Sequence, residues 1–229
     1  PATLQTLMFG DDFNHPLDHV RLPATLQTLT FGHKFNQSLV GVQLPAALQT
    51  LTFGDDFDQP LLGVRLPATL QTLTFGHIFN QSLVGVQLPA ALQTLTFGDD
   101  FDQPLLGVQL PATLQTLNFG LCFDQPLHGV QLPATLQTLT MGDLFHQPWD
   151  GVQLPVALRT LSFGRGELTH IQFAIEAYRA FRGGGSVRRK RRKWLRPIMM
   201  LPGVTFDAQL RTFIFGDGLD QPDVQVPSF

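Results

Sequence analysis

The sequence of 229 residues contains a single cysteine, Cys122. One cysteine excludes an internal disulfide framework and favours a reducing compartment, so we expect a cytoplasmic or nuclear location. No run of 18 apolar residues occurs, and no membrane-spanning helix is therefore expected. The GxSxG and HExxH motifs and the phosphate-binding loop are missing as well. These absences argue against a disulfide scaffold, a membrane-spanning protein and the enzyme classes that carry those motifs.

A unit of 22 residues is repeated along the chain from its first residue. Residues 23–44 read PATLQTLTFGHKFNQSLVGVQL, and residues 45–66 read PAALQTLTFGDDFDQPLLGVRL. A fixed period of this length is typical of solenoids, in which each unit packs on its neighbours. Because the chain begins in phase with the repeat and without methionine, we expect it to be a fragment of a longer array. The units begin at Pro1, Pro23, Pro45, Pro67, Pro89, Pro111, Pro133 and Pro155, and the last keeps only its first half.

Within one unit, apolar and polar residues alternate over a short stretch. Leu29 and Phe31 alternate with threonines, which predicts a short strand with one face turned inward. Gly32 ends this strand, and Gly41 and Pro45 mark later bends, so each unit has no room for a regular helix. We predict a β-rich solenoid with one parallel sheet whose strands lie about 4.8 Å apart. The positions expected to be apolar and inward are those of Leu26, Leu29, Phe31, Phe35, Leu39, Val42 and Leu44.

The sequence LPATLQTLTFG, followed by FNQSL or FDQPL, resembles the FNIP repeat, a 22-residue variant of the leucine-rich repeat. The resemblance covers residues 1–164 and, in part, residues 208–222. It implies a leucine-rich-repeat-like stack of coils. Proteins with such repeats are sometimes joined to F-box or kinase-like modules, and no such module is visible in this sequence. The matching residues are Leu22, Pro23, Leu26, Leu29, Phe31, Gly32, Phe35, Asn36 and Gln37, with their equivalents in the other units.

We predict three parts in the chain. Residues 1–166 form the FNIP-like solenoid of about eight coils, with the first complete at Pro1; residues 167–201 form an insertion; and residues 202–229 form a degenerate terminal repeat. Residues 1–154 carry 3 basic residues and 12 Asp, which give a charge of −9. Residues 155–229 carry 12 basic and 6 acidic residues, which give +6. A negatively charged repeat array is therefore joined to a positively charged tail.

The insertion has three predicted segments: an amphipathic helix over about 167–182, a glycine linker at 183–185, and a basic run at 188–196. Seven charges in nine residues place the basic run in solvent. Three interpretations stay open: a nuclear-localisation or nucleic-acid patch, an anchor to an anionic membrane surface, or a non-functional insertion such as a translated intron. The residues of the basic patch are Arg188, Arg189, Lys190, Arg191, Arg192 and Lys193.

Acidic and histidine residues alternate at one position of the array. Paired aspartates on alternate coils would lie roughly 10 Å apart, which is too far for them to share one calcium or magnesium ion. We predict no metal site and no cofactor, and interpret the alternation as relief of charge repulsion. The predicted ladder is Asp11, His33, Asp55, His77 and Asp99.

Two other positions of the repeat carry side chains that could form a site. Asn36 is replaced by Asp58, Asp102, Asp124 or His146 in other coils, which favours an exposed turn over a buried asparagine ladder. Cys122 replaces the second residue of an aspartate pair, so we interpret it as a surface substitution rather than a nucleophile.

The array offers repeated copies of each chemical group, whereas catalysis needs one unique constellation. We therefore predict a non-enzymatic scaffold that binds a protein partner through its extended strand face. The alternative is a solenoid that binds ice, because its Thr-x-Thr columns resemble the ice-binding surface of some antifreeze proteins. The candidate partner-binding residues are Gln27, Thr30, Gln49, Thr52, Gln71, Thr74, Gln93 and Thr96.

Overall fold

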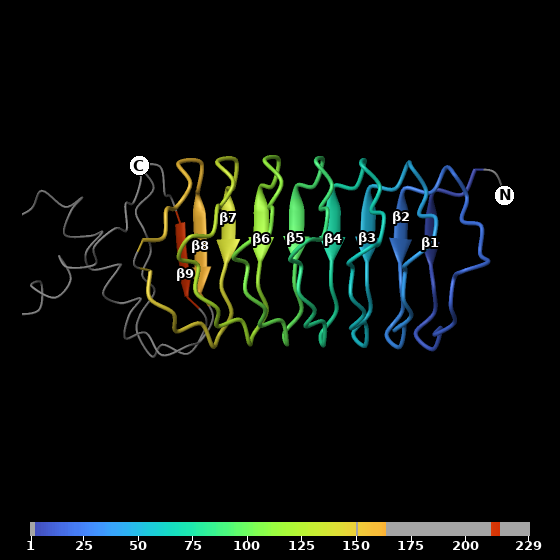
Figure 1. Ribbon diagram of the computed structural model, residues 1–229, viewed down its shortest axis with the longest axis horizontal. Coiled ribbons are helices and arrows are strands. Elements are labelled where there is room, and N and C mark those ends of the chain that lie inside the picture. The colour runs from blue at the N-terminus through green and yellow to red at the C-terminus, as the bar shows by residue number, and fades with distance from the viewer. Residues whose placement is uncertain (1–2, 150, 164–211, 216–229) are drawn as a thin grey trace, which may run out of the picture.

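The computed structural model describes residues 3–149, 151–163 and 212–215. The chain winds into coils that stack in a nearly straight row (Figure 1), and we number them 1 to 8 by the prolines that begin the repeats. Each coil contributes one short strand to a single parallel sheet, in which the strands follow one another in chain order. The strands are β1 (Thr6–Met8), β2 (Thr28–Thr30), β3 (Thr50–Thr52), β4 (Thr72–Thr74), β5 (Thr94–Thr96), β6 (Thr116–Asn118), β7 (Thr138–Thr140), β8 (Thr160–Phe163) and β9 (Thr212–Phe215).

The predicted fold class is confirmed: a parallel β-solenoid of 22-residue coils, similar to a leucine-rich repeat. Because successive coils have the same length, residues 22 apart pair with each other, as Leu51 does with Leu73. Across the described ranges the chain forms strands and turns, and no helix that could span a membrane. The predicted amphipathic helix, glycine linker and basic run lie outside the described residues. Of the predicted terminal repeat, the structure describes β9, which pairs in parallel with β8.

The core consists of leucine and phenylalanine columns that run along the solenoid. Of the positions predicted to be inward, six are buried in coil 2, and Leu44 is half-buried against the same core. Phe75 and Phe79 stack with ring centroids 3.8 Å apart, and each also stacks on its equivalents in the neighbouring coils. Since these rings continue from coil to coil, no single coil holds a complete core.

The glycine that ends each strand lies against the coil before it. A β-carbon on Gly76 would lie 2.0 Å from the carbonyl oxygen of Gly54. The coils can therefore approach to sheet distance at this position only with glycine, which is a stronger requirement than the strand-ending role expected from the sequence.

Candidate functional site

The strand face presents two columns of threonine. In β3 and β4, Thr50 pairs with Thr72 and Thr52 with Thr74, while the leucine between them is buried. All four threonines are half-buried on the solvent side of the sheet. The same arrangement continues from β2 to β7, except that Asn118 replaces one threonine.

The predicted partner-binding residues form two rows on this surface. Gln49, Gln71 and Gln93 are exposed and Gln27 is half-buried, at the start of each strand. The backbone fixes the glutamine row, because the carbonyl of Gln49 accepts hydrogen bonds from the amides of Gln71 and Thr72 at 2.8 and 2.9 Å. The strands β2 to β7 contain no charged residue. The structure thus brings the predicted residues together as a regular, uncharged surface.

A few residues after each strand, asparagine and aspartate side chains form a ladder that joins the coils. Oδ1 of Asp58 accepts hydrogen bonds from the backbone amide of Asn80 and from Nε2 of Gln81, both at 2.9 Å. Oδ1 of Asn36 accepts the equivalent bonds from coil 3. The expectation of an exposed turn is therefore wrong: these side chains are partly buried in a ladder, and Asp serves as well as Asn because only an oxygen acceptor is used.

The sequence also failed to indicate the role of the glutamine that follows this residue. Gln37, Gln59, Gln81, Gln103 and Gln125 each donate to the ladder oxygen of the preceding coil, at 2.8 to 3.0 Å. Its recurrence after every Asn or Asp in these coils was the available signal.

Replacing Asp58 with alanine is expected to lower the free energy of unfolding by about 1–3 kcal/mol, because two partly buried donors lose their acceptor. Asp58→Asn keeps the oxygen acceptor, and we expect a change below about 1 kcal/mol. Urea unfolding followed by circular dichroism measures both. Equal destabilisation by the two variants would contradict a ladder that depends on the oxygen alone.

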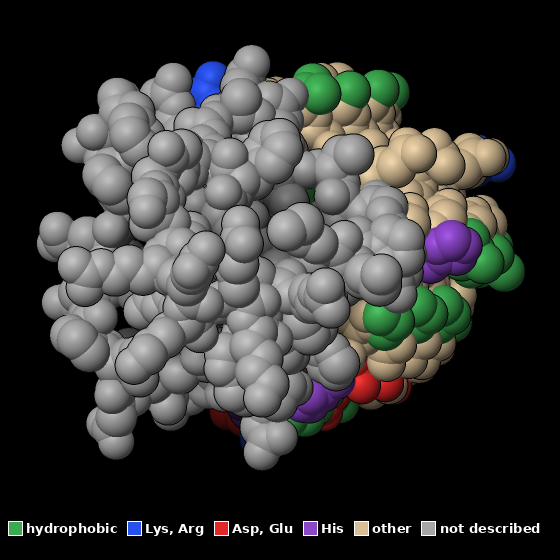
Figure 2. All heavy atoms as spheres, turned by 90° about the vertical axis from the view of Figure 1, so that its left-hand side faces the viewer, with side chains coloured by type: hydrophobic (Ala, Val, Ile, Leu, Met, Phe, Trp, Pro, Cys, Tyr) green, Lys and Arg blue, Asp and Glu red, His purple; other side chains and the backbone are tan. Residues whose placement is uncertain are grey.

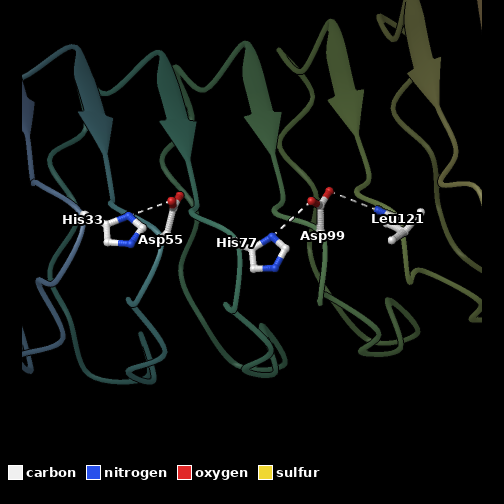
Figure 3. A network of polar contacts seen from close by, with 5 residues as sticks. All are labelled: His33, Asp55, His77, Asp99 and Leu121. Atoms are coloured by element: carbon white, nitrogen blue, oxygen red, sulfur yellow. Dashed lines mark hydrogen bonds and ion pairs between the residues drawn. The ribbon is translucent and has the colours of Figure 1, made fainter.

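Histidine and aspartate alternate next to the strand ends, as predicted (Figure 3). Nδ1 of His33 lies 2.8 Å from Oδ2 of Asp55, and Nδ1 of His77 lies 3.1 Å from Oδ2 of Asp99. In both pairs the aspartate belongs to the coil that follows the histidine. Asp99 also accepts a hydrogen bond from the backbone amide of Leu121 at 3.4 Å. Each of these contacts joins neighbouring coils on an exposed surface.

Lys34 follows His33 in the sequence and forms an ion pair with a residue of coil 1. Its Nζ lies 2.6 Å from Oδ1 of Asp12. The hydrogen bond and the charge of Lys34 lower the pKa of Asp12, and Asp12 in turn raises the pKa of Lys34. Among the residues that the structure describes, no three His, Cys, Asp or Glu side chains come together in a group that could hold a metal ion.

Cys122 lies partly exposed on coil 6, close to the aspartates of coil 5. Burial raises the pKa of its thiol, and the negative charges of Asp100, Asp99 and Asp102 raise it further. The thiolate is thus disfavoured at neutral pH, which supports the interpretation of Cys122 as a surface substitution rather than a nucleophile.

We expect alkylation of Cys122 by iodoacetamide to follow a pH profile displaced above that of a free cysteine peptide. Asp100→Asn removes one of the negative charges, so the profile should move down in pH and the rate at pH 7.5 should rise. Mass spectrometry of the alkylated protein measures the rate. A rate that Asp100→Asn leaves unchanged would contradict the electrostatic coupling between coils 5 and 6.

A family model described as FNIP Repeat matches residues 1–34, 35–77, 79–122 and 123–166. Among solved structures, the chain is similar to CroV588, described as a novel circular LRR protein, with a TM-score of 0.68 and 41% sequence identity. The match covers 72% of this chain and 24% of CroV588, so the chain spans about a quarter of that protein's length. No curated protein matches the sequence.

Proposed function

Since this chain belongs to the FNIP-repeat family, we propose that it is a non-enzymatic scaffold that binds a protein partner through its strand face. The observation that carries the proposal is the regularity of that face. Glutamine and threonine side chains recur on every coil from β2 to β5, in register and without charge. Stacked repeats of this kind form extended surfaces suited to macromolecular partners.

The chemistry of the array supports binding rather than catalysis. The ion pairs and polar ladders of the described coils join one coil to the next and recur with the repeat. An active site requires a specific set of different groups that converge in one place. Repeated hydroxyl and amide groups instead supply many equivalent hydrogen bonds to a large partner.

The proposal is tested with two variants that add the same positive charge at different places. Thr52→Lys/Thr74→Lys/Thr96→Lys changes the strand face. Gln43→Lys/Gln87→Lys/Gln109→Lys changes exposed positions outside the strands. Proteins captured from cell lysate by the wild-type chain are identified by mass spectrometry and compared with those captured by each variant.

We expect a partner that is captured by the wild-type chain and by the variant changed outside the strands. The variant with lysines on the strand face, called the threonine variant, should lose this partner. Three lysines on a neutral face should weaken such a complex at least about tenfold, because each ammonium must be desolvated without a matching acceptor. Capture that survives the threonine variant would refute this choice of face.

A second candidate function, ice binding, is favoured by the same threonine register. Thr28 and Thr30 stand on one strand, and their equivalents repeat on β3, β4 and β5. The hydroxyl columns are therefore spaced about 4.8 Å along the solenoid and about 7 Å across the strand, so they form a two-dimensional lattice. A flat lattice of half-buried hydroxyl and methyl groups is suited to ordered water.

Ice recrystallisation separates the two functions, because it needs no protein partner. If the lattice binds ice, micromolar wild-type chain slows crystal growth relative to albumin, and the threonine variant does not. Growth in the presence of the wild-type chain that matches the albumin control would exclude this function.

A further inference from the structure

A row of exposed aliphatic side chains runs along the solenoid outside the strand face. Val40, Leu62, Val84 and Leu106 occupy the same position in coils 2 to 5, and these residues are 53%, 62%, 48% and 61% exposed. Each one precedes a glycine with positive φ. We call these four residues the apolar row. Figure 2, the view from the C-terminal end, shows hydrophobic side chains gathered in rows that run along the stack.

The apolar row has alternating height, because leucine and valine differ in reach. Cδ1 of Leu62 lies 3.4 Å from the point that a β-carbon on Gly85 would occupy, so it leans over the glycine of the next coil. Leu106 leans over Gly129 in the same way, and the ring of His128 in coil 6 leans over Gly151. These three side chains form the knobs of the surface.

Three other glycines leave notches between the coils. The corresponding points on Gly41, Gly63 and Gly107 have no heavy atom within 4 Å. Val40 and Val84 precede Gly63 and Gly107 by one coil and are too short to cover them. The three notches are thus open places beside exposed glycine backbone.

The knobs of one row face the notches of a second, identical row when the two rows run in opposite directions. The knobs lean on the glycines of coils 4, 6 and 7, and the notches lie at the glycines of coils 5, 3 and 2. In a second copy turned antiparallel about a twofold axis between coils 4 and 5, each knob therefore faces a notch. The facing pairs are Leu62 with Gly107, Leu106 with Gly63, and His128 with Gly41.

We propose that the apolar row is a self-association surface, on which a second copy of this chain docks antiparallel with its knobs in the notches of the first. Such an interface is isologous and closed, so it yields a dimer rather than a filament. The spacing matches along the whole row because both copies have the same coil repeat of about 4.8 Å.

The polar side chains at the two ends of the row are consistent with this orientation. Asp18 holds the equivalent position in coil 1, one coil before the notch at Gly41. In the antiparallel dimer, His128 of one copy enters that notch and comes next to Asp18 of the other copy. Within one copy the two residues are five coils apart, or about 24 Å.

The interface is small, so the dimer is a reversible one. Four aliphatic side chains and their surroundings bury less than the roughly 800 Å² per partner of a standard interface. A dissociation constant of about 10–100 μM is expected. The dimer leaves the strand face free, so the failure of this inference and the failure of the proposed function are distinguishable.

Sedimentation equilibrium of the full chain tests the proposal. Leu62→Gln/Leu106→Gln should weaken the dimer at least about tenfold, because both apolar knobs are lost. Val156→Gln is the matched control, since Val156 is 61% exposed but lies outside the row. Equal effects of the two variants, or a wild-type chain that stays monomeric to about 1 mM, would overturn the proposal.

A second variant separates shape from general apolar attraction. Val40→Leu/Val84→Leu adds apolar surface, and coils 3 and 5 already carry leucine at this position, so the fold accepts it. The new leucines should lean over Gly63 and Gly107 and close two notches. We expect dimerisation to weaken at least about tenfold; a dimer as tight as the wild type, or tighter, would refute the knob-and-notch interface.

A charge exchange tests the antiparallel orientation. His128→Asp places a carboxylate opposite Asp18 of the second copy and should weaken the dimer. Adding Asp18→Lys should restore it, because the lysine then faces the new carboxylate across the interface. Since the two positions are too far apart to interact within one chain, a double variant that stays as weak as His128→Asp would reject this orientation.

Discussion

Replacing Gly76 with alanine is expected to lower the free energy of unfolding by about 3 kcal/mol or more. The new β-carbon would lie 2.0 Å from the carbonyl oxygen of Gly54 and 2.7 Å from Cα of Asp55. Both neighbours are backbone atoms in a hydrogen-bonded stack, so they cannot turn aside as a side chain would. The two coils must separate locally, and the strand bonds between β3 and β4 must lengthen.

Urea unfolding followed by circular dichroism measures this effect. Because each coil contacts only its neighbours, we also expect the transition to broaden as the array divides at the junction between coils 3 and 4. Gly10→Ala is the matched control, since a β-carbon there has no heavy atom within 4 Å. That variant should change the free energy of unfolding by less than about 1 kcal/mol. An equally small effect at Gly76 would show that the coils can separate easily.

Phe79→Ala is expected to destabilise the protein by about 3–5 kcal/mol. The ring of Phe79 is fully buried, and it stacks on Phe75 within its own coil and on Phe57 and Phe101 in the coils beside it. Its removal leaves a cavity that fixed rings on three sides cannot fill. The same urea titration measures the loss.

The control for Phe79→Ala lies one residue earlier. Ile78→Lys introduces the residue that the chain itself carries in coil 2, at Lys34, and Ile78 is only half-buried. Its effect should stay below about 1 kcal/mol. If Phe79→Ala were as mild as this exchange, the phenylalanine stack would not be a main source of stability.

Much of the fold could be predicted because the length of the repeat and its pattern of apolar residues determine the geometry of each coil. The alternation around Leu29 and Phe31 indicated a strand of the right position and exposure, and the fixed period of 22 required a parallel sheet in register. The wrong prediction concerned the turn at Asn36. Its replacement by aspartate suggested an exposed position, whereas the structure uses only the oxygen that both residue types possess.

Other features could not be predicted because they depend on distances between coils. The sequence shows that Gly76 recurs every 22 residues, but not that a carbonyl oxygen occupies the place of its β-carbon. Similarly, Val40 and Leu62 are both aliphatic in sequence, and only the stacked structure shows which glycine each side chain reaches. The candidate surface residues were placed together by the strand register, but their chemistry alone does not indicate which molecule they bind.

The exchange of residues between coils has a consequence for how such a chain can change in length. Residues 23–66 and 67–110 differ only at Lys34/Ile78 and Arg65/Gln109, and none of these four side chains is buried. Unequal crossing-over within the gene could therefore add or remove a 44-residue pair while every junction between coils keeps its hydrogen bonds, its phenylalanine stack and its histidine–aspartate phase. Each event would lengthen or shorten the strand face by about 9.6 Å. Gain of a single 22-residue coil would keep the sheet but bring two acidic coils, or two histidine coils, together. Duplication or loss of such pairs can thus change the length of the strand face in steps of two coils.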